Sequence, residues 1–168
     1  MRLVAEEAGV STGMLNHYFA NRKDLLTKTL VFVSEEAEER IREAIAGMPP
    51  GRERLAALLD GVLAEEEHME QTWRVWINSY GEAVRLGALR NTIEGHLSRW
   101  FELVEYALEG LAPPVRDGEV PWSWLLNALL SGLAIQALTS EAALDRAKIR
   151  DEVTRVLLGA SAGSSKDS

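Results

Sequence analysis

The stretch of residues 10–26 most constrains what this chain can fold into, because two breaks in it enclose one short helical segment. Gly9 suits the left-handed conformation that ends a helix, and Ser11 is a favoured cap at the start of the next one. A short helix is therefore expected over residues 12–18, and Asn21 caps a third helix. A helix, a turn and a short polar-faced helix are the outline of a helix-turn-helix, whose second helix enters the major groove of DNA.

The charge of the chain is divided unevenly along its length. The 168 residues carry a formal net charge of −8, whereas residues 1–30 hold four basic and three acidic side chains, a net charge of +1. Because DNA affinity depends on local phosphate contacts, an acidic body behind a weakly basic N-terminal part is compatible with DNA binding. The charge balance alone does not indicate it.

The helix-turn-helix stretch also resembles a known family. The signature of TetR-type transcriptional regulators is similar to the pattern Ala5-x-x-Ala8-Gly9-Val10-Ser11-x-Gly13-x-Leu15-x-His17-Tyr18-Phe19-x-Asn21-Arg22-x-x-Leu25-Leu26. This chain departs from the family at Asn16, where a Tyr is usual, and at Arg22, where a Lys is usual. Family members also have another helix before this motif.

The resemblance implies a ligand-responsive DNA-binding transcriptional regulator, with repression as the expected mode. Its partners would be operator DNA, a small-molecule effector and a second copy of the chain, with no cofactor and no membrane. Thr12, Gly13 and Asn16 are expected near base edges or the adjacent backbone. The residues expected at DNA phosphates are Ser11, His17, Tyr18, Arg22 and Lys23.

Helical periodicity predicts an all-α chain. Helices are expected over residues 22–46, 52–66, 70–85, 89–111, 122–138 and 141–158, with Ser140 as the cap of the last. Segments rich in Pro and Gly, 47–51 and 112–118, interrupt them. The expected organisation is a partial helix-turn-helix domain with its connecting helix at 1–46, an effector-binding and dimerisation domain at 47–158, and a disordered tail at 159–168.

The long helix expected at residues 22–46 has an apolar face and a charged face. Its apolar stripe consists of Leu26, Leu30, Val33, Ala37, Ile41 and Ile45. On the charged face, Glu36–Arg40 and Glu38–Arg42 are i,i+4 pairs in the favourable order, each worth roughly 0.2–0.5 kcal/mol. We interpret this face as solvated rather than as a metal-binding acidic cluster.

Aromatic residues are concentrated in the body. The chain has five tryptophans, and rings of this size leave gaps that smaller side chains do not. In the family the effector pocket lies among the body helices, although core packing is the alternative interpretation of each ring. The residues expected at the effector are Trp73, Trp76, Tyr80, Trp100, Phe101 and Asn127.

The body further resembles that of the choline-responsive BetI group. The similar segments are Trp73-Arg74-x-Trp76 and Gly132-Leu133-Ala134-x-Gln136. Aromatic rings beside Glu82, Glu94 or Glu102 would hold a cationic ligand by cation–π contacts, at roughly 0.5–2 kcal/mol per ring. From the sequence, an apolar or mixed effector is favoured over a cationic one.

The two last helices have more apolar surface than one neighbour needs. Residues 122–138 are apolar nearly all round but too short and too polar for a membrane span. The pair resembles the helices that form the four-helix dimer interface of TetR-type regulators, with ordinary core packing as the alternative. The predicted dimer interface consists of Leu126, Leu130, Leu133, Ile149, Val153 and Val156.

Enzyme and metal functions have little support. The chain has no cysteine, no Gly-rich phosphate loop and no nucleophile or zinc motif. Of its three histidines only His68 has carboxylates beside it, and the adjacent Glu67 points about 100° away on a helix. We expect no catalytic residue, metal or cofactor. The lack of cysteines and of an apolar leader favours a cytoplasmic protein.

A second hypothesis follows from the start of the chain. Without a preceding helix, Val4, Ala8, Leu15, Phe19 and Leu26 are expected to face water, at roughly 25 cal/mol per Å². Residues 1–20 are then expected to be mobile, rearranged or covered by another molecule, and operator binding to be weak or absent. The chain would be a truncated ligand-binding or dimerisation-only protein, unless its gene begins upstream.

Overall fold

The computed structural model describes residues 1–63, 67–87, 89–111, 119–139 and 145–163. Every regular element in these ranges is a helix, so the predicted all-α class is confirmed. The elements in chain order are α1 (Arg2–Glu7), α2 (Thr12–Tyr18), α3 (Arg22–Ile45), α4 (Arg52–Val62), α5 (Glu67–Leu86), α6 (Arg90–Leu108), α7 (Trp122–Thr139) and α8 (Arg146–Gly163).

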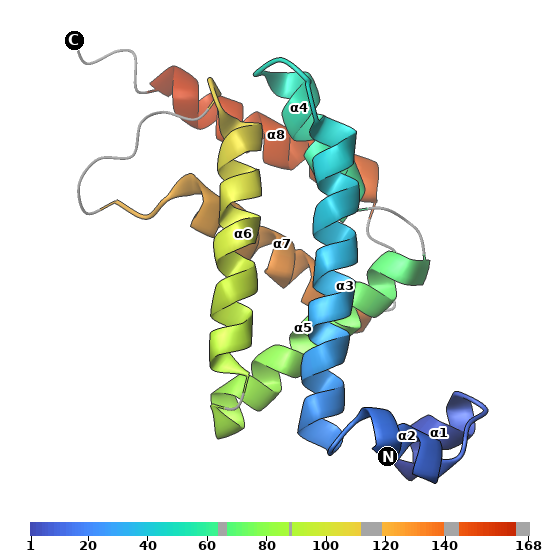
Figure 1. Cartoon of the computed structure of the whole chain (residues 1–168). Helices are drawn as coiled ribbons and strands as arrows, with labels where there is room; N and C mark the ends of the chain where they lie inside the picture. Colours follow the sequence, from blue (N-terminus) through green and yellow to red (C-terminus); the bar gives the residue numbers. More distant parts are fainter. Residues whose placement is uncertain (64–66, 88, 112–118, 140–144, 164–168) are drawn as a thin grey trace.

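The first two helices form a small head at one end of the molecule (Figure 1). Both predicted caps are confirmed: the Ser11 hydroxyl accepts the Met14 N–H at 3.0 Å, and the Asn21 side chain accepts the Asp24 N–H at 3.0 Å. Gly9 has a φ of 65°, which lets the chain turn from α1 into α2 without strain. Short-range side-chain chemistry thus sets where α2 and α3 begin.

Helix α3 joins the head to the body and runs its length beside α6 (Figure 1). Near its start, the Lys28 ammonium donates to the Tyr18 carbonyl at the end of α2 and to the Asp24 carboxylate, both at 3.1 Å. The same ammonium lies 5.4 Å from the centre of the Phe19 ring. A cation at a helix C-terminus is favoured by the helix dipole, so Lys28 fastens α2 to α3.

The head buries less than the body does. Leu15 and Ala5 are buried, whereas Val4 and Ala8 are exposed and Phe19 is half-buried. The expectation that Leu15 faces water is therefore wrong: its side chain is buried in a head in which α1 packs against α2. Val4 and Ala8 do face water, as expected.

The main core lies where α3, α4 and α6 meet. Ile41 and Ile45 of α3 pack with Leu58 of α4 and Val104 of α6, all nearly free of solvent. Burial of each such side chain contributes roughly 1.5–3 kcal/mol. Gly61 permits the close approach of α4 to α3, because a Cβ there would lie 2.9 Å from Ile41 Cγ1. The inner faces of α7 and α8 complete this core.

Helix α8 differs most from the prediction. It begins at Arg146, not at 141, and the Asp145 carboxylate accepts the Lys148 N–H at 3.0 Å; Ser140, the predicted cap, lies outside the described residues. It ends at Gly163, so residues 159–163 are helical although a disordered tail was predicted there. In the part of the chain that the structure describes, none of the helices has the length and apolarity to span a membrane.

Candidate functional site

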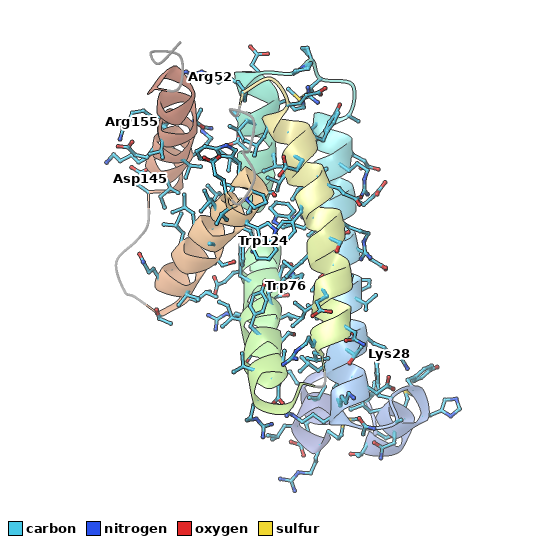
Figure 2. The ribbon with its side chains drawn as sticks, turned by 90° about the vertical axis from the view of Figure 1, so that its left-hand side faces the viewer. Lys28, Arg52, Trp76, Trp124, Asp145 and Arg155 are labelled. Carbon is cyan, nitrogen blue, oxygen red and sulfur yellow. The ribbon has the colours of Figure 1, made fainter. Side chains whose placement is uncertain are left out.

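A cavity opens in the body between α3, α4, α5, α6 and α7. Its volume is about 70 Å³, which is room for about five water-sized groups and therefore for a small ligand. Figure 2 shows Trp76, one of its lining residues, well above the end of the body where Lys28 marks the junction with the head. The cavity is lined by Ser34, Ala37, Glu38, Ile41, Val62, Thr72, Trp73, Trp76, Tyr80, Leu97, Trp100 and Asn127.

One wall of the cavity is aromatic because α5 places its rings at helical spacing. The Trp76 and Tyr80 rings lie 5.4 Å apart between centroids, and the Trp73 indole N–H donates to the Val62 carbonyl at 3.4 Å. Burial raises the pKa of Tyr80 above 10.0, while a hydrogen bond with the Asn127 side chain acts in the opposite direction. The Tyr80 hydroxyl is therefore neutral at physiological pH and available for hydrogen bonding.

A carboxylate, that of Glu38 on α3, also lines the cavity. The Glu38 side chain is 9% exposed, and one of its oxygens accepts the Arg99 Nε–H at 3.0 Å. The other oxygen lies 3.4 Å from His96 Nδ1, which is also contacted by the Arg99 guanidinium. The predicted solvated pair of Glu38 with Arg42 is wrong: Arg42 pairs with Glu39, and Glu38 turns inward to α6.

Ser34 lies one helical turn before Glu38 on the same helix. Its side chain is buried, and its Oγ atom has no hydrogen-bond partner among the described residues. A buried hydroxyl without a partner carries a free-energy cost of about 1–3 kcal/mol. A ligand group that accepts or donates a hydrogen bond here would remove that cost.

The sequence prediction and the structure overlap strongly at this cavity. Five of the six predicted ligand residues line it, whereas Phe101 stacks on Trp124 instead, with ring centroids 5.4 Å apart. The predicted acidic partners Glu82, Glu94 and Glu102 do not line it. Ser34 and Glu38 were not predicted as lining residues. Both follow Leu30 at a spacing of four residues, one and two helical turns later, on the face that the apolar stripe marks as inward.

The eight predicted DNA-contacting residues are all exposed on the head or at the start of α3. The Tyr18 ring lies edge-on to that of His17, with centroids 5.2 Å apart. Arg22 has a partner from the body: its guanidinium donates to the Glu82 carboxylate of α5 at 2.9 Å. The eight residues are thus accessible on the surface, and one of the two cations among them, Arg22, is already paired with the body.

The predicted dimer residues fall on two different faces of α7 and α8. Leu126, Leu130 and Val153 are buried in the core of the chain and leave no surface for a second copy. Leu133 and Ile149 are half-buried, and Val156 is exposed. The large apolar side chains that α7 leaves exposed are Trp124, Leu125, Leu129 and Ile135. Because the helix is apolar on both sides, the sequence did not distinguish its inner face from its outer one.

Among the described residues, no three His, Asp or Glu side chains are placed to hold a metal ion. The side chains of Glu67 and His68, which the sequence singled out, lie outside the described residues.

Comparisons with known proteins cover both parts of the chain. The family described as "Bacterial regulatory proteins, tetR family" matches residues 1–29, and the family described as "BetI-type transcriptional repressor, C-terminal" matches residues 50–160. The regulator BetI of Brucella anthropi is 26% identical over 160 residues, which are 93% of this chain and 81% of the relative. The regulator PksA of Bacillus subtilis is 29% identical over 161 residues, 94% and 75% of the two chains.

Solved structures share the fold. A TetR-family transcriptional regulator from Rhodococcus sp. superposes with a TM-score of 0.73 at 26% identity, over 95% of this chain and 84% of that one. A transcriptional regulator from Saccharomonospora viridis in complex with choline gives 0.74 at 23% identity, over 89% and 80%. The sequence resemblance to TetR-type and BetI-like regulators is confirmed. The chain therefore belongs to the TetR family as a DNA-binding transcriptional regulator with a BetI-type body.

Proposed function

We propose that the cavity binds a small organic cation as effector, and that its binding releases the chain from its operator. The observation that carries this proposal is that aromatic rings and a shielded carboxylate, Glu38, line the same small cavity. Cations over aromatic faces gain about 0.5–2 kcal/mol, more where water is excluded. The sequence favoured an apolar or mixed effector over a cationic one, because it did not predict Glu38 at the cavity. The structure-based proposal reverses that preference.

The size and polarity of the cavity narrow the class of effector. Its small volume suits a headgroup such as trimethylammonium, and Ser34 offers a hydrogen bond to an oxygen on the same ligand. Choline has both groups, and the Saccharomonospora viridis regulator was solved with choline. Choline is accordingly the first probe to test.

The decisive experiment compares choline with its uncharged isostere 3,3-dimethyl-1-butanol by calorimetric titration. The two ligands share shape and hydroxyl group, so their difference in affinity isolates the positive charge. We expect choline to bind at least about tenfold more tightly, equivalent to 1.4 kcal/mol. Equal affinity, or tighter binding of the neutral alcohol, would contradict a cationic effector.

A matched pair of variants locates the charge partner. Glu38→Gln is expected to remove most of the preference for choline over the neutral isostere. Glu39→Gln makes the same change one residue along α3, on an exposed side chain, and is expected to keep the preference. Loss of preference in both variants would mean that the net charge of the chain, not Glu38, selects the cation.

DNA binding is assigned to the head. The first two helices present α2 for a major groove, with Thr12, Gly13 and Asn16 toward the bases and the phosphate-contacting residues around them. The head with α3, residues 1–46, is the DNA-binding part, and residues 47–158 hold the effector. Since α3 belongs to both parts, a ligand at Ser34 and Glu38 acts directly on the helix that carries the head.

A second copy of the chain is proposed to pack on the outer faces of α7 and α8. The support is the set of exposed large apolar side chains Trp124, Leu125, Leu129 and Ile135 of α7 with Val156 of α8. Contiguous exposed apolar surface marks interaction sites. Two-fold symmetry would place two heads roughly 34–36 Å apart, one turn of DNA. No catalytic role is assigned to any residue.

A further inference from the structure

An ion pair joins the head-bearing end of α3 to the body. Arg22 is the first residue of α3, and its guanidinium donates to Glu82 Oε1 at 2.9 Å. The second oxygen of Glu82 accepts from Arg85 at 2.8 Å. The Arg22 side chain is 73% exposed, whereas that of Glu82 is 18% exposed, so the carboxylate is held in place and the arginine reaches it from the solvent side.

Glu82 is held by more than one contact. It lies in a groove between the start of α3 and the end of α5, whose walls include Leu26, Val75 and Asn78. The two arginines lower the pKa of Glu82, with the Arg22 hydrogen bond as the largest cause. The carboxylate is therefore ionised throughout the physiological range, and its charge is a permanent feature of this junction.

Helix α5, which carries Glu82, also forms a wall of the effector cavity. Trp76 and Tyr80 line that cavity, and Glu82 follows Tyr80 by two residues in the same uninterrupted helix. A helix moves largely as one body, so a displacement at the cavity is transmitted to Glu82.

We propose that Glu82 is a latch that competes with DNA phosphate for Arg22 and so weakens operator binding when α5 holds it in place. The inference rests on the DNA contact proposed for Arg22. While Arg22 is paired, its positive charge is neutralised and a carboxylate stands beside the approaching phosphates. When Glu82 withdraws, Arg22 gains a full charge for the DNA backbone.

The solvent exposure of Arg22 determines how strongly its ion pair with Glu82 can weaken DNA binding. Because Arg22 is exposed, its ion pair with Glu82 is weak, and removal of the pair is expected to change DNA affinity by about two- to fivefold. A freed arginine that contacts one phosphate also steepens the dependence of log affinity on log salt concentration by about one. Both quantities are measurable without knowledge of the effector.

The test uses the full chain and a mixed-sequence DNA duplex, with binding followed by fluorescence anisotropy over a series of salt concentrations. Glu82→Gln is expected to bind about two- to fivefold more tightly at low salt, with a steeper salt dependence. Glu70→Gln is the matched control: it removes the same charge from the same helix, where Glu70 pairs only with an arginine of α5 as far as the described contacts go. It is expected to change affinity much less.

Arg22→Gln separates the latch from the DNA contact. This variant is expected to bind more weakly, and the addition of Glu82→Gln to it is expected to have an effect no larger than that of Glu70→Gln. Unchanged binding by Arg22→Gln would refute the proposed phosphate contact, whereas weakened binding with no gain in Glu82→Gln would refute the latch. Weaker binding by Glu82→Gln would show that Glu82 orients Arg22 for the phosphate and overturn the proposal, as would undetectable binding by every form.

Discussion

Glu38 and Arg99 form an unequal ion pair, because the carboxylate is 9% exposed and the guanidinium 43%. Removing Arg99 leaves the Glu38 carboxylate as a charge almost shielded from water. Removing Glu38 leaves the Arg99 guanidinium, which water still solvates. A buried charge without a partner is far more costly than the loss of the pair itself. The two partners are therefore expected to contribute unequally to stability.

This inequality gives a prediction for unfolding in urea. Arg99→Met is expected to lower the free energy of unfolding by about 3 kcal/mol, because it strands Glu38. Glu38→Met is expected to be neutral or stabilising by about 1 kcal/mol, since it replaces a shielded charge with an apolar side chain of similar size. The opposite order would mean that Glu38 is solvated in solution.

Asp24 gives a prediction for pH dependence. Its carboxylate accepts the Ala20 N–H at 3.0 Å and the Lys28 ammonium at 3.1 Å, and the backbone hydrogen bond is the largest cause that lowers its pKa below 3.8. A lowered folded-state pKa stabilises the fold above 3.8, and this contribution is lost as pH falls through the folded value. The difference in Tm between the unaltered chain and Asp24→Asn should therefore be constant near neutrality and shrink below pH 3.8. A difference in Tm that persists below pH 3.8 would mean that Asp24 stabilises the fold through the geometry of its hydrogen bonds rather than through its charge.

At the scale of helices, the contact between α3 and α4 depends on one missing side chain. Gly61→Ala is expected to destabilise the fold by about 1–2 kcal/mol, because its Cβ would lie 2.9 Å from Ile41 Cγ1, an atom inside the side chain rather than at its tip. Gly95→Ala in α6 meets nothing within 4 Å and should stabilise by about 0.5–1 kcal/mol through helix propensity. Urea denaturation of the two variants gives the signs; stabilisation by both would show that α3 and α4 separate easily.

The helices themselves were predictable from sequence, because their caps and apolar stripes act locally. Ser11, Asn21 and the stripe from Leu30 to Ile45 gave the bounds of α2 and α3 closely. The start of α8 was missed because Ser140 and Asp145 are both good cap residues, and only packing chooses between them. The cavity was predicted through its rings but not through Glu38, since a run of glutamates has the same pattern whether or not one member turns inward. The inner and outer faces of α7 could not be told apart from the sequence, because both are apolar.

At the scale of the whole molecule, the outer face of α7 predicts the oligomeric state. Sedimentation of the unaltered chain is expected to give twice the mass of one chain, and Leu129→Glu is expected to weaken self-association at least about tenfold, by placing a charge in the apolar interface. Phe32→Glu, an equally drastic change at an exposed ring of α3, is the control and should stay dimeric. Dissociation by Phe32→Glu alone would move the interface to α3.

The contact between Lys28 and the end of α2 has a consequence for the design of hybrid regulators, in which the head of one protein is joined to the body of another. The ammonium that contacts the end of α2 comes from the second turn of α3, not from the head itself. A hybrid regulator whose head comes from a relative is therefore expected to keep this contact best if the exchanged segment runs as far as residue 28. A junction placed at the turn before Arg22 would take α2 and the lysine that contacts its last carbonyl from two different proteins.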